Sequence, residues 1–136
     1  MRIIVDTNRI ISALLKRGWT REIITSTNFE FYTIDYVLDE LRKHKKYVLK
    51  KAGMNEKEFE LLFSLVMDNI RVIPDKKIRN HMQKATDIMK NFDLKDAPIL
   101  ACALAVPNEG IWTEDKDFEK QKTVKIWKTK ELKKYI

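Results

Sequence analysis

The chain has 136 residues and a formal net charge of +7, a length that fits one domain, residues 1–136, able to fold without staples. Its single cysteine, Cys102, excludes an internal disulfide. The N-terminal apolar run breaks at Asp6 and no apolar run approaches the roughly 20 residues of a membrane span, so we expect a cytoplasmic protein with no secretory signal and no membrane contact.

Apolar periodicity predicts strands and helices that alternate along the whole chain. Short β-branched or aromatic runs between polar residues indicate strands, and apolar residues every three or four positions indicate helices. In chain order the predicted elements are a strand at 3–5, helices at 9–16 and 20–27, a strand at 29–34, helices at 36–51 and from 55 onward, a strand at 71–74, helices at 75–91 and 93–106, strands at 111–113 and 124–127 with an acidic loop between them, and a helix at 130–135. This order predicts an α/β fold, a three-layer α/β/α sandwich with a mainly parallel central sheet.

Four acidic residues stand at the edges of these predicted elements. Asp6 ends the first strand, and Glu40 lies in the first turns of the long helix at 36–51. Asp96 opens an apolar helix, and Asp115 follows the fourth strand. Because strand ends and helix starts meet at one edge of a parallel sheet, these carboxylates can converge. Crowded carboxylates repel one another unless a cation compensates, and hard divalent ions such as Mg²⁺ or Mn²⁺ suit oxygen ligands.

Each of these acids also fits an ordinary structural role. Asp6 and Asp96 are typical helix caps, Glu40 fits a solvent-facing helix position, and Asp115 and Asp117 are typical turn residues. Spacing alone does not choose between these roles and a metal site. Histidine and cysteine at zinc-binding spacing are absent from the sequence.

The order of the motifs resembles the PIN domain family. The motifs are DTN after the first strand, an isolated Glu on the third helix, DAPILACALA, and IWTEDKDF. The resemblance covers nearly the whole chain and points to small stand-alone prokaryotic members related to VapC-type toxins. It implies an α/β/α sandwich and a metal-dependent endoribonuclease that uses Mg²⁺ or Mn²⁺ to hydrolyse RNA phosphodiesters, leaving 5′-phosphate and 3′-hydroxyl ends.

The resemblance also implies roles for individual residues. The matching positions are four catalytic acids, Asp6, Glu40, Asp96 and Asp115, and three supporting residues, Asn8, Thr113 and Asp117. Among the acids, Asp6, Asp96 and Asp115 are expected to bind the metal, and Glu40 to bind it or to orient water. Glu114, Asp115 and Asp117 lie so close in sequence that the ligand among them stays open, although the motif favours Asp115. Asp39 competes with Glu40 in the same way, and the family pattern favours Glu40.

The basic composition agrees with RNA as a partner without requiring it. Lysines cluster around residues 43–51 and 120–134, and such clusters attract nucleic acid, anionic lipid or acidic protein, or simply cover a solvated surface. For a toxin of this family, the resemblance implies a small antitoxin partner and a homodimer. The alternative is a non-catalytic PIN-like RNA-binding or scaffold domain, against which the retention of every acid argues.

Overall fold

The computed structural model describes all 136 residues and contains one sheet of five strands in the order β3-β2-β1-β4-β5. Every neighbouring pair of strands is parallel, which confirms the predicted sheet. The strands are β1 (Arg2–Val5), β2 (Glu30–Ile34), β3 (Ile70–Ile73), β4 (Ile111–Trp112) and β5 (Ile126–Trp127). The central strand β1 carries Ile3, Ile4 and Val5, each with no exposed surface, as expected for a strand buried on both faces.

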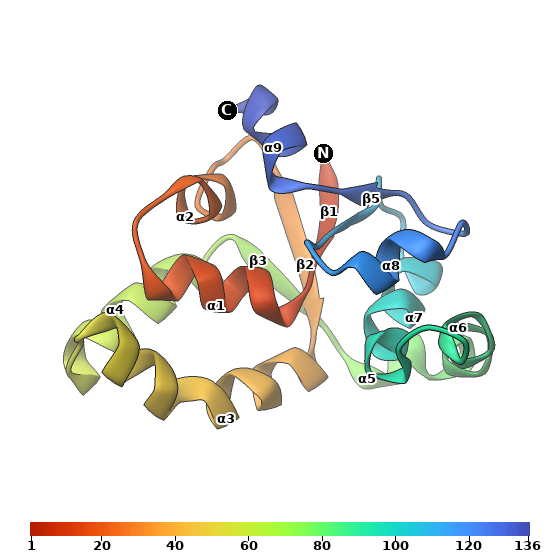
Figure 1. Cartoon of the computed structure of the whole chain (residues 1–136), viewed down its shortest axis with the longest axis horizontal. Helices are drawn as coiled ribbons and strands as arrows, with labels where there is room; N and C mark the ends of the chain where they lie inside the picture. The colour runs from red at the N-terminus through yellow and green to blue at the C-terminus, as the bar shows by residue number, and fades with distance from the viewer.

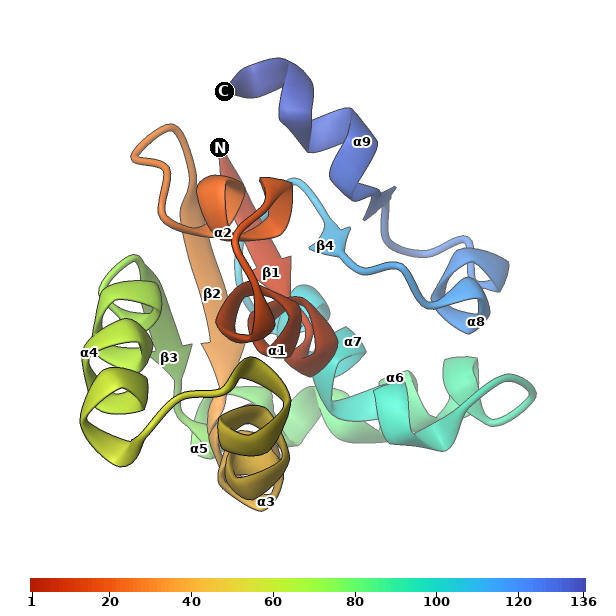
Figure 2. The same ribbon diagram turned by 60° about the vertical axis from the view of Figure 1, so that its left-hand side comes forward.

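Helices cover both faces of this sheet, which makes the fold an α/β/α sandwich. Figures 1 and 2 show α1 to α4 on one side and α5 to α7 on the other. The α-helices are α1 (Thr7–Leu15), α2 (Trp19–Ile24), α3 (Asp35–Ala52), α4 (Glu56–Met67), α5 (Asp75–Ile78), α6 (Met82–Met89), α7 (Ala97–Ala105), α8 (Lys116–Lys120) and α9 (Thr129–Leu132). Helix α1 packs against α2, α3 and α4, and α7 packs against α5, α6 and the two strands β1 and β2.

Sequence signals explain where several of these helices start and stop. Asn55 and Glu58 form the predicted capping box of α4, with Asn55 Oδ1 accepting the N–H of Glu58 at 2.8 Å. Helix α3 ends at Gly53, whose φ of +66° is the left-handed conformation that glycine adopts without steric cost. Pro98 lies in the first turn of α7, where no backbone donor is lost.

Four predicted elements differ in detail from the structure. The predicted helix at 75–91 is divided into α5, the 3₁₀ turn η1 (Arg79–His81) and α6. The 3₁₀ turn η2 (Leu94–Asp96) precedes α7, and η3 (Lys133–Tyr135) follows α9. The predicted loop after β4 contains the short helix α8, because Asp115 caps it by accepting the N–H of Asp117 at 2.9 Å. No helix is long and apolar enough to span a bilayer.

Candidate metal and active site

The acids identified from the sequence line one cavity of about 170 Å³ at the carboxyl end of β1. It lies where β1 leads into α1, beside the first turns of α3, the start of α7 and the loop between β4 and α8. The acids that line it are Asp6, Glu40, Asp93, Asp96 and Asp115. Convergence therefore occurs although these residues come from separate parts of the chain, because the parallel sheet gathers strand ends and helix starts at one edge.

Asp6 serves both as a helix cap and as part of the cavity wall. Its Oδ1 accepts the N–H of Arg9 at 3.0 Å in the first turn of α1, and its Oδ2 accepts a short hydrogen bond from the hydroxyl of Thr113. Burial raises the pKa of Asp6, although these two hydrogen bonds oppose the change. The cap occupies only Oδ1, and Oδ2 makes the bond to Thr113 on the side of β4. Asp6 is therefore able to cap α1 and to line the cavity at the same time.

Thr113, at the end of β4, connects two acids of the cavity. It has no exposed surface; its hydroxyl donates to Asp6 and accepts the N–H of Asp115 at 3.1 Å. A single hydroxyl offers one donor and two acceptor positions, so both bonds form at once. Thr113 therefore lies between Asp6 and Asp115, and its supporting role toward a metal site stays a prediction.

The tightest group of acids is Asp93, Asp96 and Asp115. One carboxylate oxygen from each lies within 4.8 Å of the other two. No other set of three His, Cys, Asp or Glu residues in the structure brings its ligand atoms this close together. Burial and the neighbouring carboxylates of Asp115 and Asp93 raise the pKa of Asp96 to about 8. In addition, Asp96 Oδ2 is buried without a hydrogen-bond partner. A buried oxygen left unpaired among like charges is costly unless the carboxyl group takes up a proton or a cation binds there.

The sequence-based site did not include Asp93. Its Oδ1 accepts the N–H of Lys95 at 3.0 Å and so caps η2. Asp93 is the extended residue that precedes η2 and Asp96 is the last residue of η2, so the two acids stand at the two ends of one 3₁₀ turn. The sequence DLKD before the apolar helix was the signal that could have identified it. Asp6, by contrast, lines the cavity but stands outside the tightest group.

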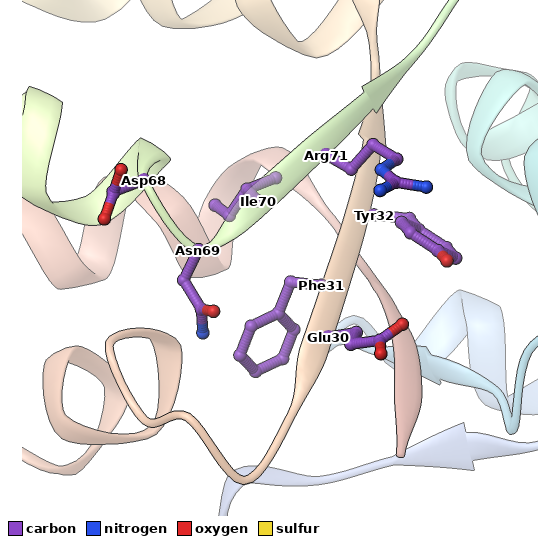
Figure 3. Close-up of a pocket in the computed structure, with 7 residues that line it drawn as sticks. All are labelled: Glu30, Phe31, Tyr32, Asp68, Asn69, Ile70 and Arg71. Atoms are coloured by element: carbon purple, nitrogen blue, oxygen red, sulfur yellow. The ribbon is translucent and has the colours of Figure 1, made fainter.

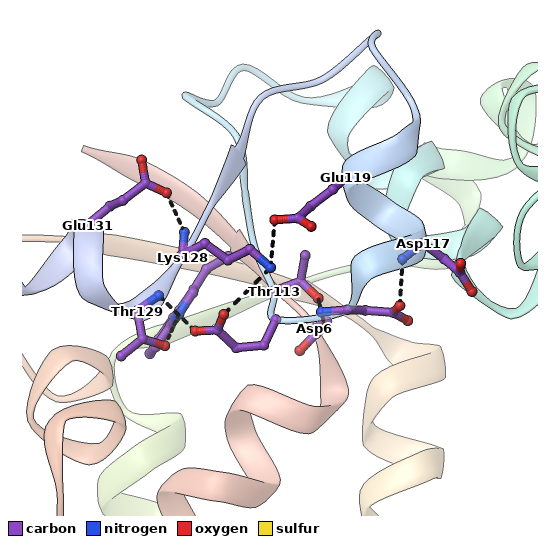
Figure 4. A network of polar contacts seen from close by, with 10 residues as sticks. Asp6, Thr113, Asp117, Glu119, Lys128, Thr129 and Glu131 are labelled. Carbon is purple, nitrogen blue, oxygen red and sulfur yellow. Dashed lines mark hydrogen bonds and ion pairs between the residues drawn. The ribbon is translucent and has the colours of Figure 1, made fainter.

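Contacts from α9 separate Glu114 from the other acids. Its Oε1 accepts the N–H of Thr129 at 3.0 Å, and its Oε2 lies 3.7 Å from Lys128 Nζ. Lys128 Nζ also pairs with Glu119 at 2.8 Å, as Figure 4 shows. Glu114 therefore points to the β5–α9 segment, and it does not line the acid cavity.

Asp117 also lies outside the cavity, where it forms an ion pair with Lys120 at 3.1 Å. Its backbone N–H nevertheless holds Asp115, the residue of this acidic loop that does line the cavity. The same distinction applies on α3. Glu40 lines the cavity, with Lys43 Nζ 3.5 Å from its Oε1, whereas Asp39 pairs with Arg42 at 2.9 Å and does not.

The rim of the cavity carries groups of a different chemistry. Asn8, Tyr36, His44 and Lys95 are exposed residues that line it. Burial and the nearby Glu40 raise the pKa of the Tyr36 phenol, which therefore keeps its proton. A neutral or basic rim around an acidic floor suits a ligand that carries phosphate oxygens toward a bound cation.

A second hollow, of about 340 Å³, lies at the opposite edge of the sheet, at the amino ends of β2 and β3. Figure 3 shows its two acids, Glu30 and Asp68, on opposite sides of the hollow. Arg71 lies over the Tyr32 ring, with its guanidinium carbon 6.0 Å from the ring centre. Because its acids stay apart, this hollow lacks the crowded carboxylates of the cavity at β1.

The donor set of the acid cavity fits a hard divalent cation. All of its charged floor groups are carboxylates, and oxygen ligands favour Mg²⁺ or Mn²⁺ over soft metals. The unpaired oxygen of Asp96 and the mutual repulsion of the acids give such an ion a reason to bind. The residues present are therefore able to hold the metal that the resemblance implies.

Comparison with known proteins identifies a family. No curated protein matches the chain. The sequence model of a family described as PIN domain matches residues 4–136. Proteins of this family are usually metal-dependent nucleases, and the group of three acids in the cavity is compatible with that chemistry. Since the match begins within the central strand and continues to the last residue, the chain belongs to the PIN domain family.

Proposed function

We propose that the protein is an endoribonuclease that hydrolyses RNA phosphodiesters with the help of Mg²⁺ or Mn²⁺. The observation that supports this most directly is the buried, unpaired oxygen of Asp96 among the carboxylates of Asp93 and Asp115. A domain that only binds RNA gains nothing from such repulsion, because acids oppose the binding of a phosphate backbone.

In this proposal Asp93, Asp96 and Asp115 hold the metal, with Asp6 on the neighbouring wall of the cavity. A bound divalent ion would supply positive charge that offsets the carboxylates and stabilises charge on phosphate oxygens. Thr113 keeps Asp6 and the loop of Asp115 in place through its two hydrogen bonds, as residues behind metal ligands commonly do.

The remaining lining residues have roles toward substrate and water. Glu40 faces the cavity from α3 and is placed to orient a water molecule or to take up its proton. Lys95 and His44 stand at the rim, where they are able to contact phosphate oxygens. The net charge of +7 favours approach of RNA and makes its binding weaken as salt rises.

The test is RNA cleavage in Mg²⁺ or Mn²⁺, with and without a chelator. We expect Asp96→Asn to lower the cleavage rate more than about 100-fold, because loss of a residue that merely orients a metal ligand already costs about 10–100-fold. Glu40→Gln has a matched control in Asp39→Asn, which changes an exposed acid one position away on the same helix. Cleavage that continues unchanged in Asp96→Asn, or in the presence of chelator, would refute the proposed site.

The finer parts of the family resemblance remain proposals as well. If the nuclease is a toxin, expression of the native protein in a bacterial host should arrest growth, and expression of the Asp96→Asn variant should not. A small antitoxin would then co-purify with it when the neighbouring gene is co-expressed. A homodimer should appear as twice the chain mass in sedimentation. RNA binding without any metal-dependent cleavage would instead favour the non-catalytic alternative.

A further inference from the structure

A further hollow, distinct from the one at the amino ends of β2 and β3, shares one residue with the acid cavity. Its volume is about 370 Å³, and its lining residues are Tyr36, Asp75, Ile78, Arg79, Met82 and Pro98. Tyr36 also lines the acid cavity, so the two spaces meet at this residue. Figures 1 and 2 show the elements that contribute, with the start of α3 near α5 and α7. We name this space the Tyr36 hollow.

The chemistry of the Tyr36 hollow combines an apolar floor with a polar rim. Ile78 is 3% exposed and Met82 and Pro98 are half-buried, which makes the floor apolar. Asp75 and Arg79 are exposed at the sides and supply one acceptor group and one group of donors. Tyr36 is 37% exposed as a whole residue, and it is one of the residues that line the hollow.

These features match an unpaired nucleobase. A base has two flat apolar faces, which stack on aromatic side chains, and an edge of hydrogen-bond donors and acceptors. The hollow is an open depression of about 370 Å³ and not an enclosed pocket, so a flat ligand is able to enter it from the surface. A paired base in a duplex has both faces stacked and its edge occupied, so it is unable to enter.

We propose that the Tyr36 hollow binds the base of the RNA nucleotide next to the phosphate in the acid cavity, with Tyr36 as the stacking platform. This inference rests on the proposed nuclease function, because it places the neighbouring phosphate at the acids. Since entry requires an unpaired base, the substrate is single-stranded RNA or a loop. Arg79, which lines the same hollow beside the carboxylate of Asp75, supplies positive charge for the RNA backbone.

The chain supplies a matched control for Tyr36 on the same helix. Tyr47 is also a tyrosine of α3 and is 52% exposed, but it lines neither the acid cavity nor the Tyr36 hollow. Any general effect of removing an exposed aromatic ring from α3 therefore appears in Tyr47→Ala. Tyr36→Phe keeps the ring and removes the hydroxyl, which separates stacking from hydrogen bonding.

The experiment measures the binding of a fluorescently labelled single-stranded RNA 12-mer of mixed sequence, and of its duplex, by anisotropy at low salt. The KM for cleavage of the same single-stranded RNA is then measured in Mn²⁺. We expect Tyr36→Ala to weaken binding of the single strand and to raise KM by about tenfold, while Tyr36→Phe and Tyr47→Ala stay within about twofold of the native protein. The native protein should also prefer the single strand over the duplex, and Tyr36→Ala should lose that preference.

Folding is checked by the thermal unfolding midpoint of each variant. If Tyr36→Ala does not fold, Arg79→Ala at the exposed rim gives the second probe, and it should weaken single-strand binding several-fold while Arg42→Ala does not. Equal effects of Tyr36→Ala and Tyr47→Ala, or equal binding of duplex and single strand by the native protein, would overturn the inference. If the native protein cleaves RNA in that case, the proposed function survives without this subsite. If Tyr36→Ala weakens binding of the single strand as expected but the native protein never cleaves RNA, the base-binding site stands and the nuclease proposal is wrong.

Discussion

Replacement of Asp96 by asparagine should stabilise the metal-free protein at neutral pH. The pKa of Asp96 is raised from 3.8 to about 8 by burial and by the carboxylates of Asp115 and Asp93. Between about pH 4 and pH 8, Asp96 therefore carries a proton in the native state and has lost it in the unfolded chain. Because the native state binds more protons there, the free energy of unfolding falls as pH rises through this range.

The size of the effect follows from the same values. At pH 7 the carboxyl group stands about 3 pH units above its unfolded pKa, and each unit corresponds to about 1.4 kcal/mol. The resulting figure of about 4 kcal/mol is an upper bound, since the side chain is only partly buried and water screens its charge. We expect about half of it, so that Asp96→Asn gains about 2 kcal/mol at pH 7 and almost nothing at pH 4.

The assay is urea and thermal unfolding of native and Asp96→Asn protein with chelator present, at pH 4 and pH 7. A gain of about 2 kcal/mol corresponds to roughly 6 °C in the unfolding midpoint of a domain of this size. Added Mn²⁺ should raise the midpoint of the native protein and leave that of the variant nearly unchanged. Asp39→Asn, at an exposed position, should change stability by less than about 0.5 kcal/mol. An equal gain at both pH values, or an equal response to Mn²⁺, would refute the account of Asp96 as a repelled ligand.

Three further results test the site from other directions. Affinity for Mn²⁺, measured by calorimetry, should rise up to about tenfold per pH unit below pH 8 and level off above it, because binding displaces the proton of Asp96; a flat profile would contradict this. Thr113→Val removes the hydroxyl that binds Asp6 and should cost about 1–3 kcal/mol in chemical denaturation, whereas Thr113→Ser should restore most of the loss. Lys128→Met removes the ion pairs with Glu114 and Glu119 beside the β4–α8 loop and should weaken Mn²⁺ binding by less than about tenfold, because Lys128 contacts no metal ligand itself. Its control, Lys45→Met, breaks a comparable pair of glutamate contacts between residues that do not line the cavity and should leave Mn²⁺ binding unchanged.

The sequence by itself determined the fold class and most of the acids that line the cavity. Ile3, Ile4 and Val5 form a run that only a strand buried on both faces accommodates, and such strands belong to parallel sheets. Once the sheet is parallel, its topology brings strand ends and helix starts to one edge. Asp6 and Asp96 were therefore identifiable, because their positions depend on local patterns that the sequence contains.

The tertiary structure decided which acids face one another. Glu114 is drawn away from the cavity by Thr129 and Lys128, and Asp93 joins Asp96 and Asp115 because η2 folds back toward the β4–α8 loop. These contacts join segments that are distant along the chain. Local spacing carries no information about such contacts, since their distances are set by how the layers pack.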